Sequence, residues 1–247
     1  MGVTFDGSTD YYNLASPSIS TYPFTMACWF RASALAGETR LMAIGDSAST
    51  SHEHALYTFT SGTTTIRALS RANSNAIATL ASPTLSTGTW YHGCAVFASA
   101  TDRTIYLDYV NSQNDTTSKT PLGADVLRIS REARSTSTKM WTGDICHPAV
   151  WADSLLPDEV AALAAGAHPT MIRPGSLTYY LPLETVSIFD PLGNVWTENG
   201  TPVESGDCPP VFYPSDPWVG FTAGGAPPAG LSIPVAMHHY TKNIGAA

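Results

Sequence analysis

Hydrophobic and polar residues alternate with a period of two in several segments, and this pattern predicts β-strands. In residues 24–32, Phe24, Met26, Cys28 and Phe30 fall on one face of an extended chain and Trp29 falls on the other. Clusters of Ser, Thr, Asn, Gly and Pro separate the strand-like segments, as turns require. Many strands joined by turns predict an antiparallel β-sandwich or jelly roll. The other predicted strands cover residues 64–69, 89–98, 104–110, 126–130 and 177–183.

Two of these strands make specific predictions about their faces. In residues 104–110, Ile105, Leu107 and Tyr109 are expected on one side of the strand. In residues 89–98 two alternating sets are expected on opposite faces: Trp90, His92, Cys94 and Val96 on one, and Tyr91, Gly93, Ala95 and Phe97 on the other. In residues 24–32, Trp29 likewise lies on the face opposite the apolar set. Both faces of these strands are therefore expected to be partly covered.

One segment has helical periodicity instead. Val160 and Leu163 give a narrow apolar stripe, and Leu156 falls at the N-cap, where Ser or Asp is preferred. A helix this short needs a sheet to rest on, so we predict that it covers one end of the sandwich. The residues expected in its first turn and just past its end are Pro157, Asp158, Glu159 and Gly166.

The composition changes after about residue 168. Twelve of the 18 prolines lie in residues 169–247, and they exclude residues 208–240 from regular helix and from central strands. The same stretch is rich in large apolar side chains, so it requires a surface to cover it, either on its own domain or on a neighbouring subunit. The residues expected to make this contact, as an assembly arm, are Val211, Phe212, Tyr213, Trp218, Phe221, Leu231 and Ile233.

Charge and composition exclude several classes of partner. Only 13% of the residues are charged and the net charge is −8, which argues against binding to nucleic acid. The sequence contains no run of 18 apolar residues, so it predicts no membrane-spanning helix. The first residues lack a basic segment followed by an apolar one, so we expect no secretory signal.

Four cysteines, Cys28, Cys94, Cys146 and Cys208, are widely spaced and form no CxxC motif, which argues against a zinc site. Cys28 and Cys94 lie inside apolar, strand-like runs. We expect buried free thiols in a protein made in a reducing cytoplasm, with a disulfide as the alternative.

Six segments in order resemble the concanavalin A-like jelly roll, and within it the laminin-G-like domains. The resemblance extends over about residues 3–184. It implies an all-β, antiparallel jelly-roll sandwich with one short helix over residues 1–184. Residues 185–247 match no part of this family, and from their composition we expect a proline-rich irregular extension with a few short strands. The segments that carry the resemblance are "VTFDGSTDYYNL" (3–14), "PFTMACWFRA" (23–32), "TGTWYHGCAVF" (87–97), "RTIYLDYVNS" (103–112), "WTGDICHPAVWADSLLPDEVAALAAG" (141–166) and "LTYYLPLE" (177–184).

The chain departs from the family pattern at two places. Asp108-Tyr109 stands where the family has Asp-Gly, so the hairpin turn there is expected to differ. Leu156 replaces the capping Ser.

Candidate catalytic residues are not evident in the sequence. Retaining glycosidases need two carboxylates about 5 Å apart, and no two glutamates of this chain lie within four residues of each other. No GxSxG motif is present for a serine hydrolase. We therefore expect that the protein is not an enzyme.

Metal binding is also not predicted, and no cofactor is expected. His52 and His54 share one face if the segment "SHEHA" is extended, but no third ligand is near, so we interpret residues 51–55 as a solvated loop. Calcium is kept as an alternative because some laminin-G-like domains use it. The turn residues with oxygen ligands are Asp102, Asp108, Asn111, Asn114 and Asp115, without a diagnostic spacing.

Carbohydrate binding requires exposed aromatic rings together with hydrogen-bonding groups. The candidates are Tyr11, Tyr12, Tyr106 and Tyr109, although aromatic residues of a sandwich more often belong to its core. Trp29, Trp90 and Trp141 fall at strand positions expected to be core.

Low charge, abundant Ser and Thr, the apolar arm and the lack of an active site favour a non-enzymatic virion structural protein, in the style of tailed bacteriophages. The first hypothesis is a capsid decoration or cement protein, located in the virion, that binds the major capsid protein or other virion proteins and forms a dimer or trimer. The alternative is a lectin-like carbohydrate-binding or host-adhesion module with a glycan as partner.

Overall fold

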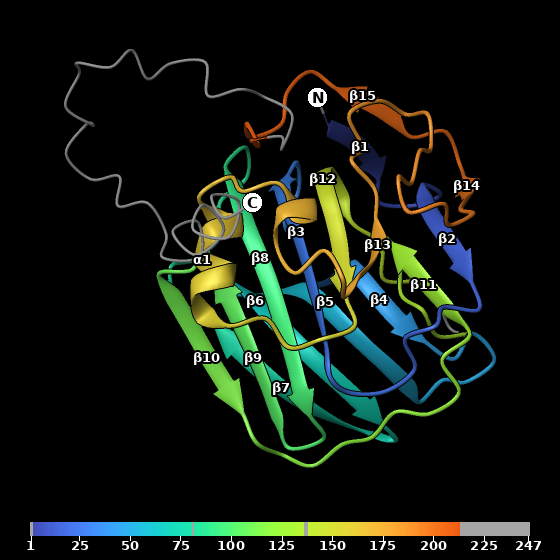
Figure 1. The fold of residues 1–247 in the computed structure, drawn as a ribbon, viewed down its shortest axis with the longest axis vertical. Helices are drawn as coiled ribbons and strands as arrows, with labels where there is room; N and C mark the ends of the chain where they lie inside the picture. The colour runs from blue at the N-terminus through green and yellow to red at the C-terminus, as the bar shows by residue number, and fades with distance from the viewer. Residues whose placement is uncertain (1, 81, 136–137, 213–247) are drawn as a thin grey trace, which may run out of the picture.

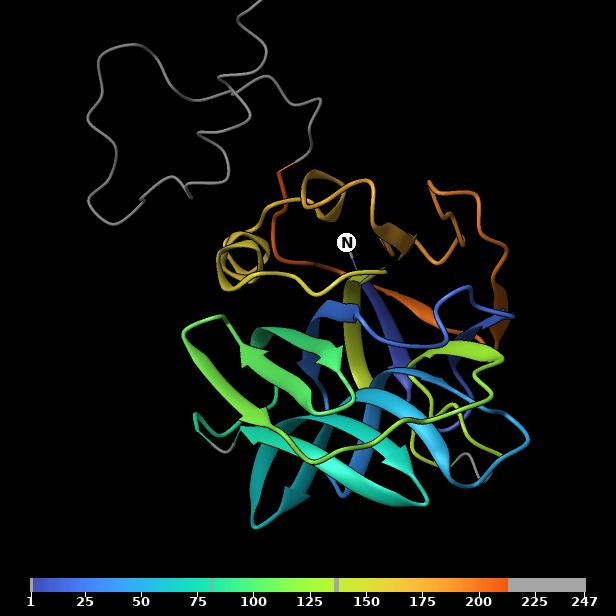
Figure 2. The ribbon, with the colours of Figure 1, turned by 60° about the horizontal axis from the view of Figure 1, so that its bottom comes forward.

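The structure, a computed structural model, describes residues 2–80, 82–135 and 138–212. Within them two antiparallel sheets face each other as a sandwich (Figures 1 and 2). In pairing order, sheet A contains β10 (Asn111–Asp115), β9 (Asp102–Leu107), β8 (Trp90–Ser99), β3 (Phe24–Ala32), β12 (Thr142–Trp151), β1 (Gly2–Asp6) and β15 (Val203–Ser205), with β13 (Leu177–Tyr180) also beside β12. Sheet B contains β14 (Thr197–Asn199), β2 (Tyr11–Ala15), β11 (Val126–Ile129), β4 (Glu38–Gly45), β5 (His52–Ser61), β6 (Thr63–Ala72) and β7 (Ser74–Leu80). The predicted all-β antiparallel sandwich is confirmed.

The main core lies between the two sheets, and strand alternation produces it. Phe24, Met26, Cys28 and Phe30 of β3 all point into this core, as the period of two predicts. Sheet B supplies the facing layer, for example Leu56 of β5. Burial of this apolar surface is the main favourable contribution to folding.

The β9–β10 turn corrects one detail of the predicted strand. Ile105 and Leu107 are buried, but the strand ends at Leu107 and Tyr109 lies in the turn, 37% exposed. Asp108 and Tyr109 have φ angles of 49° and 62°, the left-handed region that tight hairpin turns use. A non-glycine pair thus makes the turn with both central residues in the left-handed region, a conformation that usually favours glycine.

Sheet B contains strands that the hydrophobic pattern does not indicate, namely β4, β5 and β7. The clearest error concerns residues 51–55, because His52 begins strand β5 and the segment is not a solvated loop. Glu53 of β5 is fully buried and pairs with Arg40 of β4 at 2.9 Å. A buried ion pair allows charged residues inside a sheet, which makes such strands hard to recognise from hydropathy.

The predicted helix is present as α1 (Pro157–Ala164), and Gly166 follows it with a φ of 95°. The Glu159 carboxylate accepts a hydrogen bond from the backbone N–H of Leu156 at 2.7 Å, which compensates for the missing capping side chain. Val160 and Leu163 are buried in a second apolar cluster on the outer face of sheet A.

The helix therefore covers the outside of a sheet, and the prediction that it covers an end of the sandwich is wrong. The reason is that β3, β8 and β12 carry apolar side chains on both faces. Ala27, Cys94 and Trp151 belong to this outer cluster. Figure 2 shows α1 in a layer outside the strands.

Residues 185–212 follow the predicted start of the extension, and they extend both sheets. β14 pairs with β2, and β15 pairs with β1. Pairing of β15 with β1 brings Cys208 to Cys146 of the adjacent β12, where the two form a disulfide. The expectation of four free thiols is thus wrong for this pair, while Cys28 and Cys94 are buried free cysteines. Among the described residues, no helix has the length and hydropathy needed to span a membrane.

Candidate functional site

A groove of about 360 Å³ opens beside β13 and the short 3₁₀ helix η1 (Pro169–Met171). Its volume falls in the range typical of small-ligand sites. Side chains with hydrogen-bonding groups line it together with apolar ones. The polar members are His168, Thr170, Tyr180, Glu184, Thr185 and Ser187, and the apolar members are Pro182, Leu183, Phe189 and Pro191.

An irregularity in β12 positions one wall of this groove. Between Cys146 and Ala149 the pairing of β12 with β3 shifts register, and His147 there has a φ of 49°. The backbone N–H of His147 donates to Pro182 O at 3.2 Å, and that of Leu181 donates to Pro148 O at 3.0 Å. The chain that leaves β13 is therefore held against the bulge of β12, as expected for bulges that redirect a strand.

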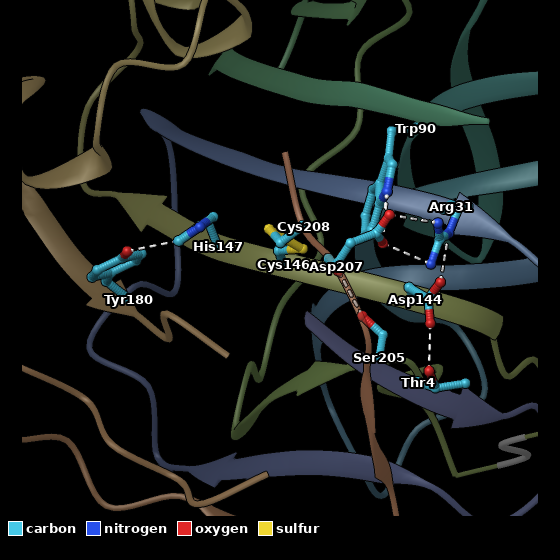
Figure 3. The surroundings of a disulfide bond; sticks show 10 residues. All are labelled: Thr4, Arg31, Trp90, Asp144, Cys146, His147, Tyr180, Ser205, Asp207 and Cys208. Carbon is cyan, nitrogen blue, oxygen red and sulfur yellow. Dashed lines mark hydrogen bonds and ion pairs between the residues drawn. A yellow bond between two sulfur atoms is a disulfide. The ribbon is translucent and has the colours of Figure 1, made fainter. Parts of the chain in front are cut away.

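His168 and Tyr180 form the floor of the groove, and hydrogen bonds connect them to the buried His147, which does not line it. The backbone N–H of Thr170 donates to Nδ1 of His168 at 3.3 Å, so the proton of the neutral ring lies on Nε2. Nε2 of His168 lies 2.9 Å from the hydroxyl of Tyr180. The same hydroxyl lies 2.8 Å from Nδ1 of His147 (Figure 3). The hydroxyl of Tyr180 thus links the two imidazole rings.

Burial keeps all three of these groups uncharged. Desolvation lowers the pKa of His147 to about 3, and the neighbouring His168 contributes to the same shift. Desolvation also lowers the pKa of His168 and raises the pKa of the Tyr180 hydroxyl. The floor therefore presents neutral hydrogen-bonding groups at pH 7.

The rim of the groove carries an exposed aromatic ring, Phe189, which is 66% exposed. The next residue, Asp190, is buried and accepts hydrogen bonds from Nδ2 of Asn194 and Nε1 of Trp196, both at 2.9 Å. These bonds fix the loop that presents Phe189. A fixed aromatic face beside hydroxyl groups and a carboxylate is suited to a sugar, which has both an apolar ring face and hydroxyl edges.

None of the predicted carbohydrate-binding tyrosines lines this groove. Tyr12 is buried against Phe5 in the main core. Tyr11 lies under the guanidinium of Arg131, 4.3 Å from its ring centroid. Tyr106 packs near α1, and Tyr109 lies in the β9–β10 turn. The four tyrosines are dispersed over the molecule and form no common site.

Of the three tryptophans predicted to be core residues, one is. Trp141 is fully buried in the main core, as expected. Trp29 and Trp90 are only partly buried and lie on the outer face of sheet A, so they are not core residues. Their strands alternate as predicted, but this part of the outer face is incompletely covered.

The histidine pair predicted as a possible metal site is divided between surface and core. His54 is buried against Phe24 and Phe97, with Nδ1 3.0 Å from Oγ of Ser70, while His52 is partly exposed. In residues 2–80, 82–135 and 138–212 no group of three or more His, Cys, Asp or Glu side chains could hold a metal ion.

The turn residues with oxygen ligands, for which no calcium site is predicted, make contacts within the β8–β10 region. The Asp115 carboxylate pairs with the buried Arg103, and Asp102 accepts a hydrogen bond from Nδ2 of Asn114 at 2.6 Å. Asp108 accepts a hydrogen bond from the backbone N–H of His92 at 2.7 Å. Asn111 begins strand β10.

Only the start of the predicted assembly arm is described. Val211 lies beside Trp29 and His92 and lines a small cavity of about 10 Å³. Phe212 is 63% exposed, and its backbone N–H donates to Gly166 O at 2.9 Å. The remaining arm residues lie outside the described residues: Tyr213, Trp218, Phe221, Leu231 and Ile233.

Sequence reasoning missed the groove residues, above all His168, Tyr180, Glu184 and Phe189. They come from η1, from β13 and from the loop that follows it, and no fixed spacing links them. The available signals were weak: an apolar Phe189 between polar residues, and an Asp190 followed six residues later by Trp196.

The fold and the groove define a β-sandwich domain of the lectin type. The family model described as the concanavalin A-like lectin/glucanases superfamily (Laminin_G_3) matches residues 6–161, more than half of the chain. The chain therefore belongs to this superfamily, and the predicted resemblance to concanavalin A-like, laminin-G-like domains is confirmed. A comparison with curated protein sequences finds no match.

Several solved structures share the fold. A heptameric SAP-like pentraxin from Limulus polyphemus superposes with a TM-score of 0.60 at 13% identity, covering 82% of this chain and 93% of that one. The CBM40 module of a Ruminococcus gnavus sialidase, bound to α2,3-sialyllactose, gives a TM-score of 0.54 at 11% identity, covering 66% and 96%. The enzymatically active domain of bacteriophage CBA120 tailspike protein 2 gives 0.54 at 20% identity, covering 70% of this chain and only 28% of that one.

Proposed function

We propose that the protein is a lectin-like, glycan-binding module that holds a sugar in the groove beside β13. The observation that carries the proposal is the exposed ring of Phe189 at a groove that is also lined by hydroxyl groups, one imidazole, one carboxylate and a few apolar side chains. The ring stacks on the apolar face of a sugar, and Thr185, Ser187 and Glu184 bind its hydroxyl groups. The sialyllactose-bound module of the same fold supports this proposal.

We further propose that the groove binds without catalysis. Among its described lining residues, Glu184 is the one carboxylate. Glycoside hydrolysis by the common mechanisms needs a pair of carboxylates on either side of the bond that is cleaved. One carboxylate among neutral groups supports recognition of a glycan more than its hydrolysis.

A glycan array with the purified chain tests the binding function. We expect hits whose affinity falls at least about fivefold in Phe189→Ala, because an aromatic stacking contact contributes about 1 kcal/mol. Phe212→Ala is the matched control, since Phe212 is similarly exposed but does not line the groove. Equal affinity of the parent and Phe189→Ala for every hit, or an array without hits, contradicts the proposal.

Attachment to a virion is a second proposal, and it is supported by the similarity to a domain of the phage tailspike and by the exposed Phe212 where the described chain ends. In this proposal the chain binds the major capsid protein or another virion protein as a dimer or trimer. The pentraxin's heptamer supports self-association of this fold. Co-sedimentation of the chain with virus particles tests the attachment, and failure to sediment with any particle argues against it.

A further inference from the structure

The groove differs from most sites for acidic sugars in the charges that line it. Its described lining residues contain one carboxylate, Glu184, and neither lysine nor arginine. A carboxylate-bearing sugar is usually bound by a cationic side chain, above all by the planar fork of arginine. Here an acidic sugar finds a negative charge at the rim and no permanent positive charge to offset it.

His168 is the one lining side chain that can become cationic, and it is buried, only 4% exposed. Its Nδ1 accepts from the backbone N–H of Thr170 at 3.3 Å and lies 2.7 Å from the Thr170 hydroxyl. Its Nε2 lies 2.9 Å from the hydroxyl of Tyr180. Both ring nitrogens are therefore engaged by groups of the protein and are not presented to a ligand as a free cation.

Burial supports the same charge state of the floor. Desolvation lowers the pKa of both His168 and His147. The one charged side chain among the described lining residues is therefore the carboxylate of Glu184. An anion placed there loses its hydration and gains no compensating charge.

We propose that the groove selects neutral sugars and rejects sugars that carry a carboxylate, such as sialic and uronic acids. This inference rests on the proposed glycan-binding function and names its ligand class. Glu184 acts twice in this selection. It accepts charge-assisted hydrogen bonds from the hydroxyl groups of a neutral sugar, and it repels an acidic sugar.

The proposal separates this chain from the sialidase module that shares its fold. That module is bound to α2,3-sialyllactose, whereas the groove here favours the same glycan without its sialic acid. Two domains that share the sandwich fold need not bind the same ligand, because specificity depends on the side chains of the site.

Binding to matched glycan pairs tests the selection. The probes are lactose and α2,3-sialyllactose, and every pair on an array that differs only by an acidic sugar, each measured in 50 mM and 500 mM NaCl. We expect the neutral member to bind at least tenfold more tightly in low salt. The difference should shrink in high salt, because salt screens the repulsion by Glu184.

Glu184→Gln gives the sharper comparison. We expect it to weaken binding of the neutral member about threefold to tenfold and to reduce the preference over the acidic member. Glu204→Gln, at an exposed position on β15, is the control and should leave both affinities unchanged. Circular dichroism melting of both variants confirms that they are folded.

The outcomes separate the two claims. Acidic members that bind as tightly as their neutral partners, or more tightly, overturn the selection while the glycan-binding function stands. An unchanged preference in Glu184→Gln also overturns it. If no member of any pair binds, the glycan-binding function itself is wrong.

Discussion

Among the described residues, four histidine side chains are buried in surroundings that lower their pKa, and three of them show the largest shifts. His54 lies between the rings of Phe24 and Phe97, His92 packs against Trp29, and His147 lies beside Tyr180. Desolvation, the largest cause in each case, lowers each pKa from 6.5 to about 3. The fold therefore accommodates these rings in their neutral form, and charging them destabilises it.

This burial makes the stability of the protein depend on pH. Between about pH 6.5 and pH 3 the unfolded chain binds protons at these histidines and the folded chain does not. The free energy of unfolding therefore falls as the pH is lowered through this window, and the histidine contribution is fully present above about pH 6.5. Three such groups amount to about 4 kcal/mol per pH unit in the middle of the window.

Replacing one of these histidines tests the explanation. In His54→Gln the slope of unfolding free energy against pH, measured by urea denaturation at pH 5.0, 5.5 and 6.0, should fall by about 1.4 kcal/mol per pH unit, because one proton fewer is bound on unfolding. Glutamine keeps an amide that can bond to Ser70. Parallel pH profiles for parent and variant would show that His54 titrates normally in the folded state.

At the scale of elements, the segment from β15 to Cys208 is attached to sheet A by three independent kinds of contact. β15 pairs with β1, and Cys208 is bonded to Cys146. The Asp207 carboxylate pairs with the Arg31 guanidinium at 2.9 Å and accepts a hydrogen bond from Nε1 of Trp90 at 3.3 Å (Figure 3). The Arg31 guanidinium stacks over the Trp90 ring at 4.8 Å. Together these contacts hold the end of the described chain on the sandwich.

The disulfide is expected to be the strongest of these contacts. It joins cysteines 62 positions apart, and closing a loop of that length in the unfolded chain corresponds to about 4 kcal/mol. The double variant Cys146→Ala/Cys208→Ala should lose about this much unfolding free energy in guanidinium denaturation. A reductant should destabilise the parent and leave the double variant unaffected. Equal sensitivity of both proteins to the reductant would assign the effect to something else.

The elements also show what can be predicted from a sequence and why the rest cannot. The strand at 24–32 has strict alternation of apolar residues, and its predicted bounds match β3. Strand β5 could not be recognised from hydropathy because it contains the charged Glu53. That residue is buried with Arg40 of another strand, and no local sequence pattern indicates this pairing. The pairing of Cys146 with Cys208 depends on β15 lying beside β1, a contact between distant segments.

The groove was missed for a related reason. Its residues lie between His168 and Pro191, where the chain passes from η1 through β13 into a loop, and only the fold turns their side chains toward one space. The exposed aromatics that the sequence did suggest, such as Tyr109, are dispersed among other surfaces. The order and spacing of the strand segments along the chain identified the family, but they did not show which side chains form the site.

At the scale of the whole molecule, the outer face of sheet B is the main alternative to the groove as a glycan-binding surface. It carries aromatic rings, but their faces are occupied by guanidinium groups. Arg67 lies 4.1 Å from the ring centroid of Phe59, and Arg40 lies 4.6 Å from that of Tyr57. Tyr57 is in addition only 2% exposed, whereas Phe189 is 66% exposed.

The most direct test of the central claim is to map a bound glycan by NMR. A ¹⁵N-labelled sample is titrated with the strongest hit of the glycan array, and amide shifts are followed to saturation. We expect the largest shifts at the groove, at Thr170, Glu184, Thr185, Ser187 and Phe189. Saturable shifts confined to the outer face of sheet B, around Tyr57, Phe59 and Arg67, would contradict the assignment of the groove as the glycan site.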